Sequence, residues 1–184
     1  MRQRATQHGH RSPRVAVFAA ALLLTACSPN LDWRESRPDG SDVTLLFPCR
    51  PDRHERSVRV ADTALRLQLN SCNAGGATFS LTVGDGAEPA QVTPLLAALR
   101  KQLLTNLGAV EATERPLPAI VGATPNPESA LLRIVGRRAD GRRVVAHAAF
   151  FVKGLRLYQA TVLTDDDPAE NGTLEPFFAS IRVS

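Results

Sequence analysis

The sequence predicts an α+β domain, a mostly antiparallel sheet with helices packed on it. The predicted strands fall into two runs, residues 43–83 and 129–163, separated by one strongly amphipathic helix between Pro89 and Gly108. Runs of strands that are segregated from helices are typical of antiparallel α+β folds. The strands of the second run are apolar on both faces, so we expect both faces of their sheet to be covered by helices.

The first 26 residues have the order of features that is typical of an export signal. Four arginines and no acidic residue come before an apolar run, residues 15–24. This run is too short to cross a hydrocarbon core, which needs about 20 residues. We therefore expect residues 1–26 to be a signal peptide that is cleaved from the mature protein.

The end of this segment, Leu24-Thr25-Ala26-Cys27, resembles the lipobox of bacterial lipoproteins. The resemblance implies that Cys27 is the lipidation site and that acyl chains hold the protein to a membrane. Two or more chains anchor a protein stably, whereas one chain binds only marginally. Ser28 resembles the pattern for sorting to the periplasmic face of the outer membrane, with the inner membrane as the alternative. A simple signal anchor is the alternative to lipidation.

The formal net charge of +4 belongs to the export segment. The chain has 22 basic and 18 acidic residues, and the four arginines of residues 1–26 account for the whole difference. The remaining chain is neutral and has one tryptophan and one tyrosine. Nucleic-acid binding domains carry a basic face, so we expect no nucleic-acid partner.

Cys49 and Cys72 are the two cysteines that remain once Cys27 carries lipid. Two thiols in an oxidising compartment are expected to pair, here closing a loop of 24 residues. Closing a loop of this length lowers the entropy of the unfolded chain, which stabilises the folded state by about 3 kcal/mol. A redox or metal-binding pair is the alternative, although the spacing is not C-x-x-C and no histidine is placed to complete a metal site. We expect a structural disulfide, no metal site and no cofactor.

Residues 27–42 are polar and contain two prolines and a glycine, so we expect a lipidated tether there, followed by a single domain over residues 43–184. Strands of the first run are indicated by alternating apolar residues and by flanking turn residues. The expected strands are residues 43–47, 57–60, 64–70 and 78–83. The second and third of these are expected to form a hairpin.

The helix between Pro89 and Gly108 has apolar residues at three- and four-residue spacing, which places them in one stripe. These residues are Val92, Leu95, Leu96, Leu99, Leu103 and Leu107. Thr93-Pro94 fits an N-cap followed by a proline in the first turn, and Gly108 fits a helix end. The proline-rich stretch of residues 115–127 is expected to be a crossing loop.

Asp140-Gly141 is a strong signal for a two-residue turn between residues 129–138 and 142–152, which we expect to form a hairpin. The remaining elements expected are a strand at residues 155–163, a short helix within residues 167–180 and an edge strand at residues 181–183. No internal repeat is present in the sequence.

Three segments, residues 43–51, 140–162 and 177–183, resemble the PsbP-like α/β/α sandwich of DcrB-type bacterial lipoproteins. Together with the leucine-rich helix, these segments cover most of residues 43–183. The resemblance implies a sheet with helical layers on both faces and a non-enzymatic accessory or binding role. It implies no substrate and no catalytic residues.

Little in the sequence points to catalysis. His54 lies in a charged run and His147 on an apolar strand, and nothing near His147 in sequence supports a catalytic triad. A nucleophile elbow and a glycine-rich nucleotide loop are absent from the sequence. Asp165-Asp166-Asp167 lacks the spacing of a calcium loop. We therefore predict no catalytic residue.

Arg137, Arg138, Arg142 and Arg143 flank the turn at Asp140-Gly141. Four guanidinium groups at one hairpin tip can bind the phosphate groups of lipids or an acidic envelope polymer. The alternative is a charged strand end that prevents edge-to-edge aggregation. This arginine tip is the best functional candidate that the sequence offers.

The main expectation is a membrane-anchored periplasmic lipoprotein that acts as a non-enzymatic interaction or accessory module of the cell envelope. Its partner would be an envelope protein or an anionic envelope polymer. The alternative is a carrier or sensor of a small apolar ligand, which predicts a cavity between sheet and helix behind Phe150, Tyr158 and Leu99. A hydrolase is a weaker alternative, and it requires His147 exposed in a cleft beside an acid and a hydroxyl group.

Overall fold

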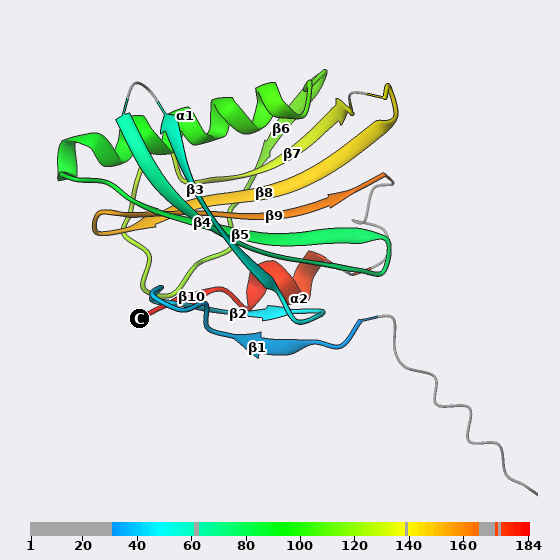
Figure 1. The fold of residues 1–184 in the computed structure, drawn as a ribbon, viewed down its shortest axis with the longest axis horizontal. Helices are drawn as coiled ribbons and strands as arrows, with labels where there is room; N and C mark the ends of the chain where they lie inside the picture. Colours follow the sequence, from blue (N-terminus) through cyan, green and yellow to red (C-terminus); the bar gives the residue numbers. More distant parts are fainter. Residues whose placement is uncertain (1–30, 61–62, 139, 166–171, 173) are drawn as a thin grey trace, which may run out of the picture.

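Two antiparallel sheets lie face to face in the computed structural model, which describes residues 31–60, 63–138, 140–165, 172 and 174–184 (Figure 1). The large sheet consists of β3 (Asp52–Val60), β4 (Thr63–Ala74), β5 (Ala77–Asp85), β9 (Arg156–Thr164), β8 (Arg143–Lys153), β7 (Ala130–Arg137) and β6 (Glu111–Arg115), in this spatial order. The small sheet consists of β1 (Arg34–Ser36), β2 (Val43–Phe47) and β10 (Arg182–Val183), with β2 in the middle. The expected signal peptide, Cys27, Asp166 and Asp167 lie outside the described residues.

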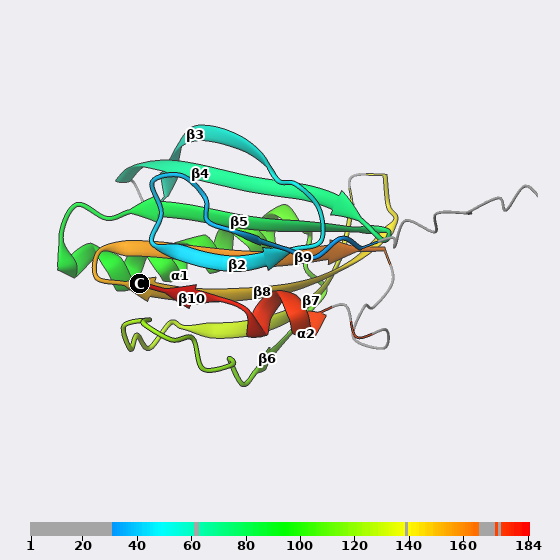
Figure 2. The same cartoon turned by 90° about the horizontal axis from the view of Figure 1, so that it is seen from below.

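The expected α/β/α sandwich is wrong. Helix α1 (Pro89–Asn106) covers one face of the large sheet, but the other face is covered by the small sheet and by the six-residue helix α2 (Leu174–Ala179) (Figure 2). The described residues are therefore mostly β-structure, with two helices. Apolar residues on both faces of a strand show that both faces are covered, but they do not distinguish a helix from a second sheet as the cover.

The core is divided between the two faces because successive side chains of a strand point to opposite sides. In β8, Phe151 packs toward the small sheet and Phe150 packs toward α1. Both rings are fully buried. The prediction that the second run of strands has two buried faces is confirmed.

Most of the predicted elements are present, and the main differences concern strands β3 and β6 and the start of helix α1. Strand β3 begins at Asp52 rather than residue 57, and its exposed first six residues give no apolar alternation. Strand β6 was not predicted, since all five of its residues are exposed. Helix α1 has Glu88 at the N-cap and Pro89 at its first position, so Thr93 is not the cap and Pro94 lies inside the helix. No helix in the described ranges is long and apolar enough to cross a membrane.

The disulfide between Cys49 and Cys72 is confirmed, with the two Cα atoms 6.0 Å apart. It joins the end of β2 to β4 and so ties the small sheet to the large one. Within the stretch that the sequence suggests as a tether, residues 34–36 form β1 and pair with β2. Trp33 packs edge-on against Phe79, with ring centroids 5.8 Å apart. The described part of this stretch, from Leu31 onward, therefore lies on the domain.

Candidate functional site

Helix α1 crosses the large sheet diagonally. Just before its start, the backbone N–H of Gly86 donates to Leu155 in the β8–β9 turn, at 2.9 Å. At its end, the N–H of Arg137 donates to the carbonyl of Leu107, also at 2.9 Å, where β7 leads into the β7–β8 turn. These two turns lie at opposite ends of β8. The diagonal path leaves part of the face formed by β3, β4 and β5 without a helix above it.

The end of α1 approaches the sheet closely at Gly136. A Cβ atom at this position would lie 2.1 Å from the carbonyl oxygen of Leu107, well inside contact distance. Only glycine lets the helix end reach β7 at this point. This contact fixes the direction of α1 and, with it, the width of the uncovered area beside the helix.

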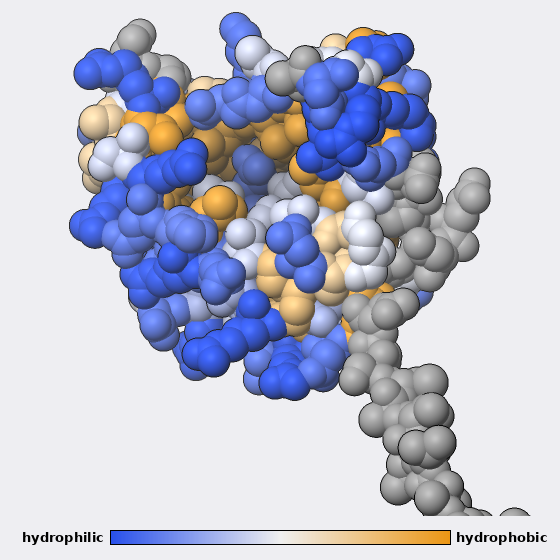
Figure 3. Space-filling view, turned by 45° about the vertical axis from the view of Figure 1, so that its right-hand side comes forward, coloured by the Kyte–Doolittle hydropathy of each residue, from blue (hydrophilic) through white to orange (hydrophobic). Residues whose placement is uncertain are grey.

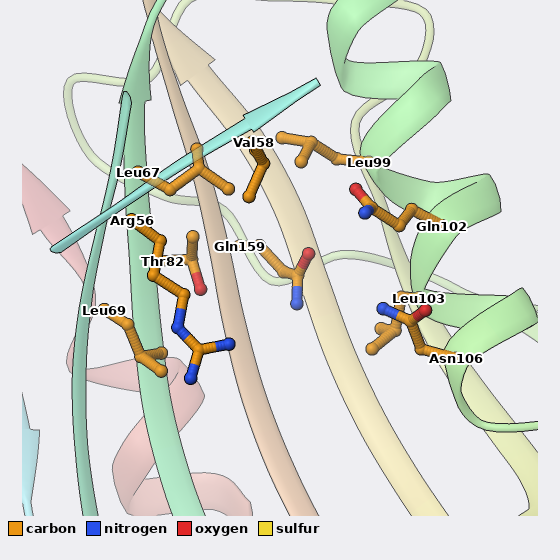
Figure 4. A pocket seen from close by; sticks show the side chains of 10 residues that line it. All are labelled: Arg56, Val58, Leu67, Leu69, Thr82, Leu99, Gln102, Leu103, Asn106 and Gln159. Carbon is orange, nitrogen blue, oxygen red and sulfur yellow. The ribbon is translucent and has the colours of Figure 1, made fainter. Parts of the chain in front are cut away.

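The uncovered area is a cleft of about 240 Å³ between α1 and strands β3, β4, β5 and β9 (Figure 4). Figure 3 shows an apolar hollow in the molecular surface beneath the helix. The apolar lining residues are Val58, Leu67, Leu69, Leu99 and Leu103. The polar lining residues are Arg56, Thr82, Gln102, Asn106 and Gln159. A mostly apolar site with a few convergent polar groups is the usual composition of a small-molecule site.

Strand register explains how residues distant in sequence meet in the cleft. Arg56 of β3 lies opposite Leu67 of β4, and Leu69 of β4 lies opposite Thr82 of β5. Thr82 in turn lies opposite Gln159 of β9. Paired residues of neighbouring strands share a face of the sheet, so these side chains form one continuous floor.

Arg56 is the one charged residue among those that line the cleft, and it makes no hydrogen bond or ion pair within the described residues. Its neighbours are paired, because Arg53 and Arg66 both donate to the carboxylate of Glu55. These hydrogen bonds lower the pKa of Glu55, and the one from Arg66 has the larger effect. Since Glu55 and Arg56 are consecutive in a strand, they face opposite sides, and the acid does not neutralise the cleft arginine.

The cleft lies only partly where the ligand-carrier hypothesis placed it. Leu99 lines the cleft, as that hypothesis expects. Phe150 and Tyr158 do not, because both are fully buried in the two halves of the core. The space is an open cleft beside the helix rather than a cavity behind it.

The arginine tip at the β7–β8 turn is largely paired within the chain. Arg138 forms an ion pair with Asp165 at 2.9 Å, and the Nε of Arg142 donates to Asp140 at 2.7 Å. The hydrogen bond from the Arg142 side chain is the main cause that lowers the pKa of Asp140. Arg137 donates to the carbonyl of Gly141 at 3.2 Å. The fourth arginine of the tip, Arg143, is exposed.

The two histidines of the domain lie in different surroundings. His54 is exposed on the edge strand β3. His147 of β8 is only 2% exposed, beside a small cavity of about 210 Å³ that Leu131 and Phe178 also line. The hydrolase hypothesis requires an exposed His147, and this burial counts against it. The described residues contain no group of three potential metal ligands.

The amide side chains of the cleft, Gln102, Asn106 and Gln159, were not predicted as site residues from the sequence. One signal was available, because Gln102 and Asn106 are four residues apart and lie beside the leucine stripe of α1. Positions four apart share a face of a helix. A second indication comes only from the structure, in which Leu103 of the same stripe is partly exposed.

Two comparisons with known proteins return no match: no protein-family model fits the chain, and no curated protein matches its sequence.

Proposed function

We propose that the protein is a lipid-anchored module of the cell envelope that acts by binding rather than by catalysis. The anchor is supported by the order of the first 27 residues: arginines, a short apolar run, small residues and Cys27. The binding role is supported by the cleft between α1 and the large sheet. In this proposal the module carries or senses a small ligand with an apolar part.

The cleft is the observation that favours a small ligand over an anionic polymer. It combines apolar walls with a cation that has no partner within the described chain. The arginine tip, in contrast, has Arg138 and Arg142 paired to Asp165 and Asp140. A polymer that engages Arg138 and Arg142 must displace these ion pairs, whereas a ligand enters the cleft without breaking one.

The path of the chain supports a position of the cleft near the membrane. The side chain of Leu31 lies against Gly75 in the β4–β5 turn, since a Cβ atom on Gly75 would lie 2.9 Å from it. Four residues after Cys27 the chain therefore reaches this turn, and four residues span at most about 14 Å. Strands β4 and β5 also line the cleft. The proposed anchor would hold this turn close to a bilayer, and Leu69 and Thr82 of the cleft lie about six residues further along the two strands, roughly 20 Å away at 3.3 Å per residue.

The anchor is tested by metabolic labelling. Cells that express the full chain are grown with an alkyne analogue of palmitate, and the purified protein is assayed for the label. We expect labelling of the wild type and of Cys49→Ser, and none of Cys27→Ser. An unlabelled wild type, or a labelled Cys27→Ser variant, overturns the anchor.

The binding role is tested by photolabelling of the full chain with a neutral decyl ester that carries a diazirine. We expect the label on peptides of β4 and α1. Thr82→Trp, which fills the cleft, is expected to lower this labelling about tenfold. The control, Thr78→Trp, lies on the same face of the same strand but outside the cleft. Labelling spread over the whole surface, or equal in both variants, overturns the cleft as a binding site.

A further inference from the structure

We infer that the ligand of the cleft is a single-chain amphiphile whose compact anionic head group, a carboxylate or a phosphate monoester, binds Arg56. Its alkyl chain would lie between α1 and strands β3 and β4. This inference rests on the proposed function, because it names the class of ligand for the same cleft. It is carried by the position of one arginine and by the chemistry around it.

The first step is the direction of the Arg56 side chain. Figure 4 shows it leaving β3 and extending into the cleft, with its guanidinium group in the space between Leu69 and Gln159. Arg59, three residues further along the strand, lies on the opposite face. Of the arginines of β3, Arg56 is therefore the one that a ligand in the cleft meets.

The second step is the charge balance. None of the described residues that line the cleft is acidic. Glu55, the nearest acid in sequence, is engaged by Arg53 and Arg66 on the other face of the sheet. The positive charge of Arg56 is therefore not compensated within the cleft. A planar guanidinium binds a carboxylate or a phosphate through two parallel hydrogen bonds, which makes an anion the matching head group.

The third step is the set of neutral polar groups. Gln102 and Asn106 of α1 and Gln159 of β9 point amide groups into the same cleft (Figure 4). Amide NH₂ groups donate hydrogen bonds without adding charge. They can therefore complete the coordination of an anionic head group that Arg56 holds, and they do not compete with it for the arginine.

The fourth step is size and polarity. Val58, Leu67, Leu99 and Leu103 give the cleft an apolar wall on both sides. Its volume of about 240 Å³ lies below the roughly 300–1,000 Å³ of pockets that bind drug-sized molecules. One alkyl chain of medium length fits this space better than the two chains of a membrane phospholipid.

The experiment compares two photoreactive probes on the full-length protein in phosphatidylcholine vesicles. One is decanoate with a diazirine on its chain, and the other is the methyl ester of the same acid. The label is mapped by mass spectrometry of the peptides. The key variant is Arg56→Gln, and the matched control is Arg59→Gln, which removes the same charge from the same strand on the opposite face. Circular dichroism verifies that both variants are folded.

We expect the acid to label β4 and α1 more strongly than the ester does. Arg56→Gln is expected to lower labelling by the acid about fivefold. An exposed ion pair contributes ~1 kcal/mol, which corresponds to this change in the binding constant. Arg59→Gln is expected to leave it unchanged. Each methylene added to a competing unlabelled carboxylate should strengthen competition about fourfold until the cleft is full.

Competition by decanoate and by decyl phosphate distinguishes the two head groups, and the stronger competitor identifies the one that the cleft prefers. If neither competes better than decanol, the anionic head group is wrong. If the ester labels the cleft as well as the acid and Arg56→Gln has no effect, this inference fails while the proposed binding role stands. If neither probe labels the cleft, both fail.

Discussion

The two faces of the large sheet are built from the same strands but are closed in different ways. Toward the small sheet, aromatic rings fill the space. Phe177 of α2 packs edge-on against Phe47 and Phe79, with centroids 5.5 and 5.4 Å apart, and Phe151 stacks on Tyr158 at 4.8 Å. Toward α1, the core is aliphatic apart from Phe150, and one diagonal helix covers it. We call these the closed face and the open face.

The difference separates stability from binding. On the closed face a sheet, a helix and a disulfide meet and leave no room for a ligand beside Phe79 or Tyr158. The cavity of about 210 Å³ beside His147 lies on the same side of the sheet, at the edge of this aromatic core. On the open face Leu103, near the C-terminal end of α1, lines the cleft and is only partly buried. Removing water from a partly exposed leucine is favourable. The apolar surface that folding leaves exposed here can therefore contribute to the binding free energy of a ligand with an alkyl chain.

The largest effect is expected from Phe177→Ala on the closed face. Phe177 is fully buried and its ring contacts three others. A buried phenylalanine cut to alanine costs about 3–5 kcal/mol. The matched change on the open face, Leu103→Ala, should cost about 1 kcal/mol because Leu103 is half-buried. Urea unfolding of both variants measures the two losses, and equal losses would contradict the division of roles.

The disulfide should contribute the next largest effect. Replacing both Cys49 and Cys72 by alanine should lower the free energy of unfolding by about 3 kcal/mol, since the unfolded chain regains the freedom of the loop. Because the bond joins β2 to β4 on the closed face, labelling of the cleft should be retained at temperatures where the variant is folded. Loss of labelling in a folded variant would show that the two faces are coupled.

Gly136→Ala tests the close contact between the end of α1 and β7, which sets the position of the helix on the open face. The added Cβ would meet the carbonyl oxygen of Leu107, so the end of α1 must move away from β7. Overpacking of this kind costs about 1–3 kcal/mol. Hydrogen exchange should speed up at Arg137, whose N–H donates to that carbonyl. Val110→Ala, at a nearby exposed position, is the control and should change the free energy of unfolding by less than about 0.5 kcal/mol.

The sequence predicted the elements whose residues alternate or repeat, and it missed those that depend on neighbours distant in the chain. Alternation is strong in β5, β8 is apolar on both faces, and both strands were predicted. The exposed strand β6 has no apolar residue except Ala112, so nothing in Glu111–Arg115 distinguishes it from a loop. The cover of the second face was predicted wrongly because burial of Phe151 is the same under a helix and under a sheet.

The candidate site shows the same limit. The leucine stripe of α1 was predicted, but the cleft arises from the diagonal path of the helix, which Gly136 and the contact with Leu107 determine. Arg56 was part of a charged run without distinction from its neighbours. The structure separates it from Arg53, which pairs with Glu55, and from Arg59, which lies on the opposite face of β3. Both distinctions depend on strand β3, whose first residues show no apolar alternation in the sequence.

The smallest effect at neutral pH is expected from Tyr158→Phe, which probes the closed face. Tyr158 is fully buried, and desolvation is the main cause that raises its pKa to about 12. The ordinary value is about 10. The unfolded chain therefore loses this proton at lower pH than the folded protein does.

The sign of the pH dependence follows from this order. Below pH 10 the phenol is protonated in both states and contributes no pH dependence. Between about pH 10 and about pH 12 the unfolded state binds fewer protons, so the free energy of unfolding falls as the pH rises. Tyr158→Phe should remove the part of this decrease in the free energy of unfolding that comes from the phenol. Because the chain has one tyrosine, phenolate absorbance reports Tyr158 directly. Titration of the folded protein near pH 10 would mean that water reaches the ring and that the closed face is not closed.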